Sequence, residues 1–208
     1  VLKTNWVEPG YLETDSAWCE PGSEPSTPLA NGGAFGAKLE SPVSEVARSL
    51  ANKYKRPVLA ILSREDSVRL GPKRPPIAGG VNKNGQGVIR VARTPGIVEA
   101  INSVAPEIDV EEIDLRGPVT SSKIRAAGWA EAQILLCGAL GEVGTIISPD
   151  GSSASAEVDE RRINISVRCG QPLNETVLRS YCIGAAHMAW SWVTSESLTV
   201  DENGEVQD

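Results

Sequence analysis

A glycine-rich run is the part of this sequence best suited to contact a ligand. It reads Gly32-Gly33-Ala34-Phe35-Gly36-Ala37-Lys38 and lies directly before a predicted helix. Glycines let a backbone approach a ligand closely and leave its N–H groups exposed, and a loop that leads into a helix favours an oxyanion or a phosphate. The run lacks the Lys-Ser/Thr ending of a P-loop. A tight connection with Phe35 packed inside therefore explains the same spacing.

Other groups that could do chemistry are scattered along the chain. His187 is the single histidine, and we interpret it as a surface or hydrogen-bonded residue of a helix. Ser191 and Ser195 have only this local histidine as a base, which argues against a hydrolase triad. Three carboxylates near the start could pair as acids, although a solvated acidic loop is the simpler interpretation: Glu13, Asp15 and Glu20.

The cysteines do not indicate a metal centre. Cys19, Cys137, Cys169 and Cys182 lie far apart, with no Cys-x-x-Cys spacing. Together with one histidine they are a poor ligand set for zinc or an iron–sulfur cluster. We therefore predict no metal ligands, and we expect Cys137 and Cys182 to serve as small core residues.

Charge and hydropathy exclude several classes of partner. The 208 residues carry a formal net charge of −7, whereas nucleic acids and anionic membranes bind basic surfaces. No apolar run reaches the ~18 residues of a membrane span, and no signal-peptide pattern is present. We predict a cytoplasmic protein that binds neither nucleic acid nor a membrane.

Residue periodicity predicts helices and strands in irregular alternation. Ser41 and Pro42 suit a helix start, and apolar residues then recur at helical spacing up to Tyr54. Residues 57–62 follow as a short buried strand. Further helices are predicted from Thr94, from residue 120 or 121 to residue 138, and over residues 178–192.

Further strands are predicted at residues 108–115, 143–148, 163–167 and 198–200. A break in alternation at Glu111-Glu112 indicates a bulge. Residues 20–28 and 71–87 are rich in Gly and Pro and are predicted to be irregular. The pattern favours an α+β fold with helices packed on a mixed β-sheet. We expect a single domain over residues 1–208, with 1–80 and 81–208 as alternative subdomains.

Several segments resemble, in chain order, motifs of the molybdenum hydroxylases, the xanthine dehydrogenase/aldehyde oxidase family. Residues 32–38 are similar to the family's GGGFGGK, with alanine at two glycine positions. Lys55-Arg56-Pro57-Val58 looks like GRPV, and Ser63-Arg64-Glu65-Asp66 looks like SRED. Asn84-Gly85-Gln86-Gly87 resembles the family's GQG loop. Asp150-Gly151, Cys169-Gly170 and Leu173-Asn174 follow the order of later motifs.

The resemblance implies the fold of the family's molybdopterin-binding large subunit, in a shortened and degenerate form. In the family, the GQG loop holds the pterin phosphate, and glycines of the last matched helix face the cofactor. The resemblance thus implies a site for molybdopterin and molybdenum at these positions: Gly32, Gly33, Ala34, Phe35, Gly36, Gly85, Gln86, Gly87 and Gly184.

The resemblance assigns no catalytic residue and no metal ligand. The family's glutamate base stands in a motif beyond the last matched strand, and the long segment expected between Arg74 and Gly85 is reduced to about ten residues. We therefore expect a shortened molybdopterin-binding-domain homologue that lacks independent catalysis. The alternative is a subunit of a split molybdenum-dependent oxidoreductase that hydroxylates an aldehyde or an N-heterocycle.

Each hypothesis implies partners. A split oxidoreductase passes its electrons to iron–sulfur and flavin subunits, because this chain has no cysteine pattern for a cluster. Trp190 and Trp192 project from different sides of one predicted helix and are hard to bury in one core. This pair predicts a homo-oligomer.

Overall fold

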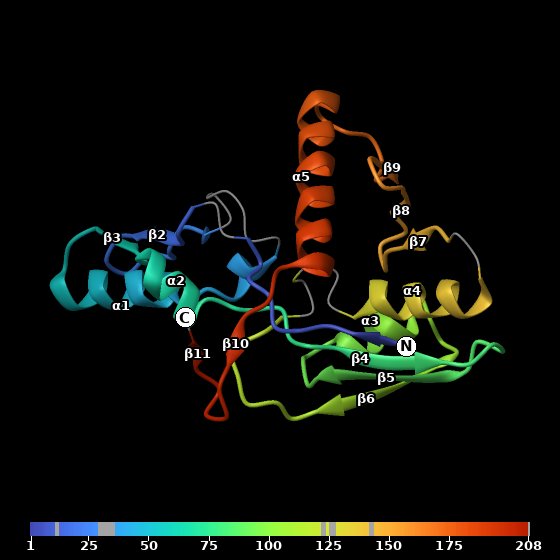
Figure 1. The fold of residues 1–208 in the computed structure, drawn as a ribbon. Coiled ribbons are helices and arrows are strands. Elements are labelled where there is room, and N and C mark those ends of the chain that lie inside the picture. Colours follow the sequence, from blue (N-terminus) through green and yellow to red (C-terminus); the bar gives the residue numbers. More distant parts are fainter. Residues whose placement is uncertain (11–12, 29–35, 122–123, 125–127, 142–143, 208) are drawn as a thin grey trace. The chain divides into compact units, whose positions relative to one another are not determined.

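The structure is a computed structural model that describes residues 1–10, 13–28, 36–121, 124, 128–141 and 144–207 (Figure 1). It contains both helices and strands, so the predicted α+β class is confirmed. The chain divides into two compact units, each built from three segments. The first unit comprises Val1–Asn5, Pro75–Leu115 and Ala126–Ser197. The second comprises Trp6–Arg74, Arg116–Arg125 and Leu198–Asp208.

A four-stranded mixed sheet forms the base of the first unit. Its order is β1-β4-β5-β6, with antiparallel pairs up to β5 and a parallel β5–β6 pair. The strands are β1 Leu2–Lys3, β4 Ala78–Val81, β5 Gly87–Ala92 and β6 Ile108–Ile113. The short helix α3, Ile97–Asn102, makes the crossover between the parallel strands, as such a pair requires.

One face of this sheet builds the core of the unit. Ile89 and Val91 alternate with exposed Arg90 along β5, and their side chains are buried against α3 and α4, Trp129–Leu140. On the opposite face, the Arg90 guanidinium donates to Glu111 on β6 at 2.7 Å. Both of these side chains are exposed, so the pair adds little stability. The buried face holds the unit together.

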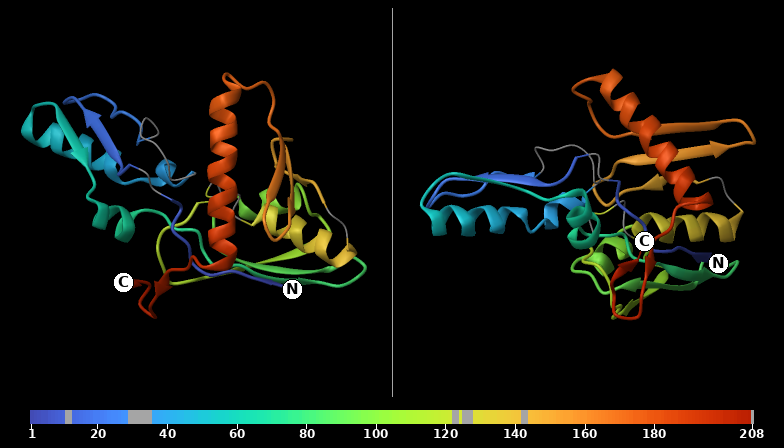
Figure 2. Two further views of the ribbon diagram at one scale, coloured as in Figure 1. Left: turned by 45° about the horizontal axis from the view of Figure 1, so that its top comes forward. Right: turned by 60° about the vertical axis from the view of Figure 1, so that its left-hand side comes forward.

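The rest of the first unit is a hairpin with a long helix. Strands β7 Ile146–Ile147, β8 Ser153–Val158 and β9 Ile163–Arg168 form an antiparallel sheet, and α5 spans Glu175–Thr194. The side chain of Gln133 on α4 bonds the backbone N–H and C=O of Ile147, which ties β7 to α4. Figure 2 shows α5 beside the hairpin, and its main contact is with β9.

The second unit is a smaller helix-on-sheet layer. Strands β2 Ser16–Cys19 and β3 Val58–Ile61 pair antiparallel, and α1, Val43–Tyr54, packs on one face of them. Val43, Ala47 and Ala51 provide the buried stripe of α1. The other described elements of the unit are short: η2 Ala37–Glu40, α2 Arg64–Leu70, β10 Thr199–Val200 and β11 Val206–Gln207.

The helices predicted over residues 43–54 and 178–192 are confirmed as α1 and α5, whereas two others begin later than predicted. Thr94 does not cap α3, because its hydroxyl donates to the Ala92 carbonyl and Gly96 precedes the helix in a left-handed conformation. The helix predicted from residue 120 or 121 begins at Trp129. Residues 122–123 and 125–127 of that prediction lie outside the described residues.

Three strand predictions are corrected. Register runs unbroken from Gly87–Ile108 to Ala92–Ile113, so β6 has no bulge. The segment 71–87 is not wholly irregular, because it contains β4. Strand β3 is not fully buried, since α1 covers only one of its faces and leaves Leu59 58% exposed. Of the predicted strand 143–148, β7 is formed at Ile146–Ile147, and Val143 lies outside the described residues.

Among the described residues, no helix has the length and apolarity needed to cross a membrane.

A buried ammonium group lies at the end of α2 in the second unit. The Lys73 side chain is fully buried and donates to the carbonyls of Ser67, at 3.1 Å, and Gly71, at 2.8 Å. Its Nζ lies 3.2 Å from a carboxylate oxygen of Glu8. Removal of the ammonium from water lowers the pKa of Lys73, while the Glu8 charge opposes this shift. Lys73 therefore ties the loop after α2 to the chain near Glu8.

We predict that Lys73→Met destabilises the protein by about 3 kcal/mol near neutral pH, because it leaves Glu8 without its ammonium partner. The lowered pKa means that the unfolded state binds more protons as pH approaches the model value of 10.5. The free energy of unfolding of the wild type should thus rise with pH relative to the variant, as measured by urea titration at several pH values. Lys73→Arg should also lack this rise, because guanidinium stays protonated. Parallel curves for wild type and both variants would contradict the prediction.

Candidate functional site

The described end of the glycine-rich run leads into a buried lysine. Gly32, Gly33, Ala34 and Phe35 lie outside the described residues. Gly36 precedes η2 with φ of 98°, a left-handed conformation that favours glycine. Two residues later, Lys38 is 1% exposed. The structure thus gives Gly36 a backbone role and turns the side chain that ends the run into the second unit.

Lys38 fixes the segment that precedes β2. Its Nζ donates to the backbone carbonyl of Glu13 at 2.8 Å and lies 3.1 Å from a carboxylate oxygen of the buried Asp15. The Asp15 carbonyl in turn accepts from the N–H of Leu62 at 2.9 Å. One lysine therefore holds the entry to β2 beside the end of β3. A buried pair of this kind strongly penalises the loss of either partner.

A polar pocket lies where these two segments meet. Its volume is about 610 Å³ and its lining comes from both sides of the β2–β3 pair: Glu13, Thr14, Ser16, Ile61, Leu62, Ser63 and Arg64. Ser16 and Ile61 are cross-strand partners on the face of the sheet opposite α1. The pocket is therefore an extension of an exposed face, with an apolar floor at one side and hydroxyl groups at the other.

The side chains of this pocket suit binding better than catalysis. Glu13 and Arg64 supply opposite charges, and Thr14 and Ser16 supply hydroxyl groups. No histidine or cysteine lines the pocket, so an activated nucleophile of the Ser–His or Cys–His type is missing from its lining. Among the described residues, no cluster of three or more His, Cys, Asp or Glu side chains is arranged to hold a metal ion.

Sequence reasoning did not find this pocket, although one signal was present. Ser63 is the N-cap of α2, and its hydroxyl oxygen accepts from the N–H of Asp66 at 2.9 Å. A serine followed three residues later by an acid is a known sequence sign of a helix start. Reading it would have placed a helix directly after β3 and the pocket-lining Arg64 in its first turn. The role of Thr14 has no comparable local signal.

The second glycine segment is the turn between β4 and β5. The side-chain oxygen of Asn82 accepts from the N–H groups of Asn84, at 2.8 Å, and Gln86, at 3.2 Å. The N–H of Gly85 donates to the Asn82 carbonyl at 3.1 Å. Three consecutive N–H groups are therefore engaged inside the turn. A phosphate would have to displace Asn82 from these donors before it could bind them.

The glycines of this turn have structural reasons to be glycine. Gly85 has φ of 82°, which the turn requires. A Cβ on Gly87 would lie 2.0 Å from the Gly80 carbonyl oxygen of the neighbouring strand. Gln86 between them is exposed at the hairpin end. The residues present do not fit a phosphate site in this conformation, because their donors are used and their glycines serve the hairpin.

Gly184 lies apart from the hairpin turn. It is exposed on α5, and nothing lies within 4 Å of a Cβ built there. A Cβ on Gly85 would meet only the side chain of Leu136, on α4. Within the first unit, the described positions of the predicted site are thus not brought together. Gly36 belongs to the second unit.

Comparison of the sequence with known proteins adds no relative. No family description matches the chain, and no curated protein matches it.

We predict that Lys38→Met lowers the free energy of unfolding by about 3–5 kcal/mol, because it leaves the Asp15 carboxylate buried and uncompensated. The matched control is Arg48→Met, which removes exposed ion pairs with Glu24 and Glu45 and should cost within about 1 kcal/mol. Chemical denaturation measures both. Equal losses for the two variants would show that the buried pair has no special weight.

Gly87→Ala should destabilise the protein by about 2 kcal/mol, since its Cβ runs into the Gly80 carbonyl oxygen. Gly80→Ala, in the paired strand, should stay within about 0.5 kcal/mol, because its Cβ meets only Val1 at 3.7 Å. Thermal unfolding followed by circular dichroism compares them. A tolerated Gly87→Ala would remove the structural explanation for this glycine.

Proposed function

We propose that the chain is a shortened homologue of the molybdopterin-binding domain of the xanthine dehydrogenase/aldehyde oxidase family and that it lacks independent catalysis. The order of the motif-like segments along the sequence supports the relationship. The absence of independent catalysis is supported by the β4–β5 turn, whose N–H groups already bind Asn82. In this proposal the chain acts as a binding or assembly module.

The hydrogen bonds of the turn are the observation that carries the proposal. An anion-binding loop needs several N–H groups that point outward and have no internal acceptor. Here the Asn82 side chain occupies the place of such an anion and accepts two of the three donations. Gln86 offers an amide at an exposed hairpin end, where water competes with any ligand. The loop therefore stabilises a turn by itself.

Enclosure of a cofactor gives a second argument. Small-molecule sites bury most of the ligand surface and need walls on several sides. Gly184 stands on a helix without a single buried residue, and the space next to it is open. The pocket of the second unit has hydroxyl, carboxylate and guanidinium groups that suit a small polar ligand.

The alternative function is a subunit of a split molybdenum-dependent oxidoreductase. The observation that favours it is the uncovered apolar surface of α5, which a partner subunit could turn into a wall of a shared site. Such a partner would also provide the remaining contacts to molybdopterin. Iron–sulfur and flavin subunits would carry the electrons away.

We predict that the chain, produced alone in a host that makes molybdopterin, is purified with molybdenum far below one equivalent and without releasable pterin. Metal analysis by mass spectrometry and fluorescence of the oxidised pterin measure both. Stoichiometric molybdenum and pterin in the isolated chain would contradict the proposal. Molybdenum that is retained in a purified complex and lost on separation of its subunits would support the split-enzyme alternative.

A further inference from the structure

Strand β9 is the outer strand of its sheet. The order is β7-β8-β9, and pairing with β8 runs from Ser153–Arg168 to Val158–Ile163. At the hairpin end, the N–H of Asp159 donates to the Arg162 carbonyl at 3.0 Å. Antiparallel pairs alternate between bonded and non-bonded positions.

This alternation fixes the direction of the β9 backbone. From Arg162, every second residue directs its N–H and C=O toward β8. The intervening residues direct theirs to the open edge: Ile163, Ile165 and Val167. No described strand pairs with that edge. The chain therefore presents a row of backbone donors and acceptors beside three β-branched side chains that are 37%, 38% and 43% exposed.

The β9 edge carries none of the charges that normally protect an open strand. Edge strands avoid pairing with other chains through charged side chains, proline or bulges. Strand β6 is also an edge strand, and its sequence IDVEEI contains three acids in six residues. Strand β9 is uncharged from Ile163 to Val167. Within one unit, β6 is therefore protected against pairing and β9 is suited to it.

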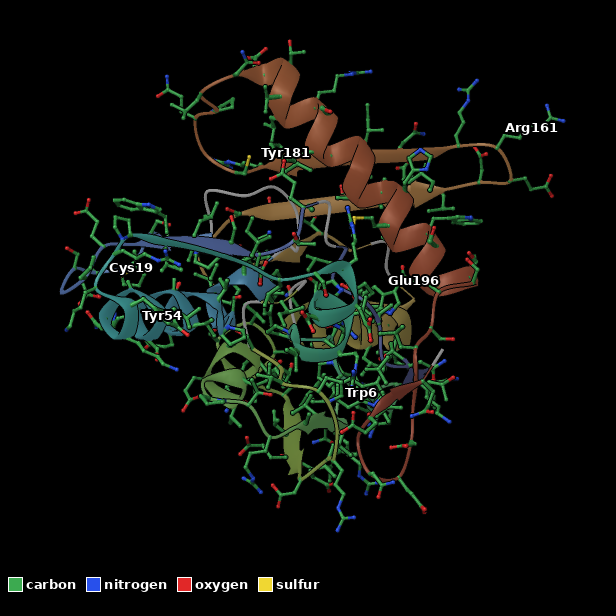
Figure 3. The ribbon with its side chains drawn as sticks, turned by 90° about the vertical axis from the view of Figure 1, so that its left-hand side faces the viewer. Trp6, Cys19, Tyr54, Arg161, Tyr181 and Glu196 are labelled. Atoms are coloured by element: carbon green, nitrogen blue, oxygen red, sulfur yellow. The ribbon has the colours of Figure 1, made fainter. Side chains whose placement is uncertain are left out.

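Helix α5 beside this strand is also incompletely covered. It contains no buried residue, and its exposed apolar side chains lie on several sides, with Tyr181 67% and Val193 81% exposed. A helix that is apolar all round belongs in an interior. Figure 3 shows α5 crossing the β8–β9 hairpin, with Tyr181 toward one end of the helix and Arg161 at the hairpin turn. The open edge and the uncovered helix adjoin.

We propose that two copies of this chain associate by antiparallel pairing of their β9 strands. The result is a continuous sheet in the order β7-β8-β9-β9′-β8′-β7′. A two-fold axis perpendicular to the sheet relates antiparallel partners and keeps each face on its own side. Both copies of α5 therefore lie on the same face, where each covers apolar surface of the other. This proposal does not rest on the proposed function.

The charges at the two ends of β9 select a register. With the two-fold axis at Asn164, Ile163 pairs with Ile165 of the other copy, and Glu160 lies opposite Arg168 of the other copy. Opposite charges in directly facing positions stabilise a strand pair. With the axis at Ile165, Arg162 would face Arg168 and repel it. The axis at Asn164 also places Arg162 diagonally to Arg168, but diagonal neighbours are farther apart than facing ones.

A second copy fits this surface better than an unrelated strand. A foreign strand would satisfy the backbone edge but would bring nothing to cover α5. A second copy provides the strand, the helix and the complementary charge in one symmetric contact. Glu160 and Arg168 make no intramolecular salt bridge among the described residues, so both side chains stay available for it.

Charge reversal at the two ends of β9 tests the proposal. Sedimentation velocity over a concentration series should show a monomer–dimer equilibrium for the wild type. Glu160→Arg and Arg168→Glu should each weaken the dimer about tenfold, because each creates two repulsive pairs. The double variant should restore wild-type affinity. The two residues stand eight positions apart on β9, roughly 26 Å along a strand, so restoration reports a contact between copies.

Three results would overturn the proposal. One is a monomer at every concentration up to the solubility limit. Another is a dimer that ignores both single reversals, and the third is a double variant no tighter than the single ones. Far-UV circular dichroism checks the fold of each protein. If a reversal unfolds the chain, Glu160→Gln and Arg168→Gln replace it, and each should then weaken the dimer by a smaller factor. A normal molybdenum analysis beside a failed dimer test would leave the proposed function standing.

Discussion

Each sheet in this chain has two faces, and a single helical layer can cover only one of them. Helices α3 and α4 bury Ile89 and Val91 of the four-stranded sheet, and the opposite face is finished with Arg–Glu pairs. Helix α1 buries one face of the β2–β3 pair. The other face of that pair keeps Leu59 and Ile61 exposed. The β7–β9 sheet has only α5, which is itself not buried. Most distinctive features of the molecule follow from this shortage of cover.

The elements that could be predicted from sequence are those whose pattern is local. Helices α1 and α5 have long runs of apolar residues at helical spacing and good starting residues, so tertiary packing only confirmed them. Strand β8 was missed because Ser153-Ala154-Ser155-Ala156 has small side chains without strong β-propensity, and its partner β9 supplies the pairing. Strand β4 was missed because Gly79 and Gly80 indicate a loop. Its glycine at position 79 lets Leu135 approach closely, which a single sequence does not reveal.

Prediction of the candidate site was limited by the same distinction. The sequence marks glycines, but it does not say which atoms satisfy their N–H groups. In the β4–β5 turn the answer is Asn82, which stands outside the predicted motif and competes with any ligand for the same donors. Lys38 was noted as the end of a glycine run. Its burial against Asp15, 23 residues earlier in the chain, depends on long-range packing. The pocket near Glu13 depends on the same packing.

Two kinds of buried or exposed imbalance therefore have different meanings in this protein. The buried ammonium groups of Lys38 and Lys73 are each satisfied by backbone carbonyls and a carboxylate inside one unit, so they are self-sufficient structural contacts. The apolar side chains of α5 and the backbone edge of β9 have no such internal solution among the described residues. Water solvates a backbone edge at little cost, but it does not compensate an apolar helix surface. The structure is consequently complete around its buried charges and incomplete around α5, where association is the physical remedy.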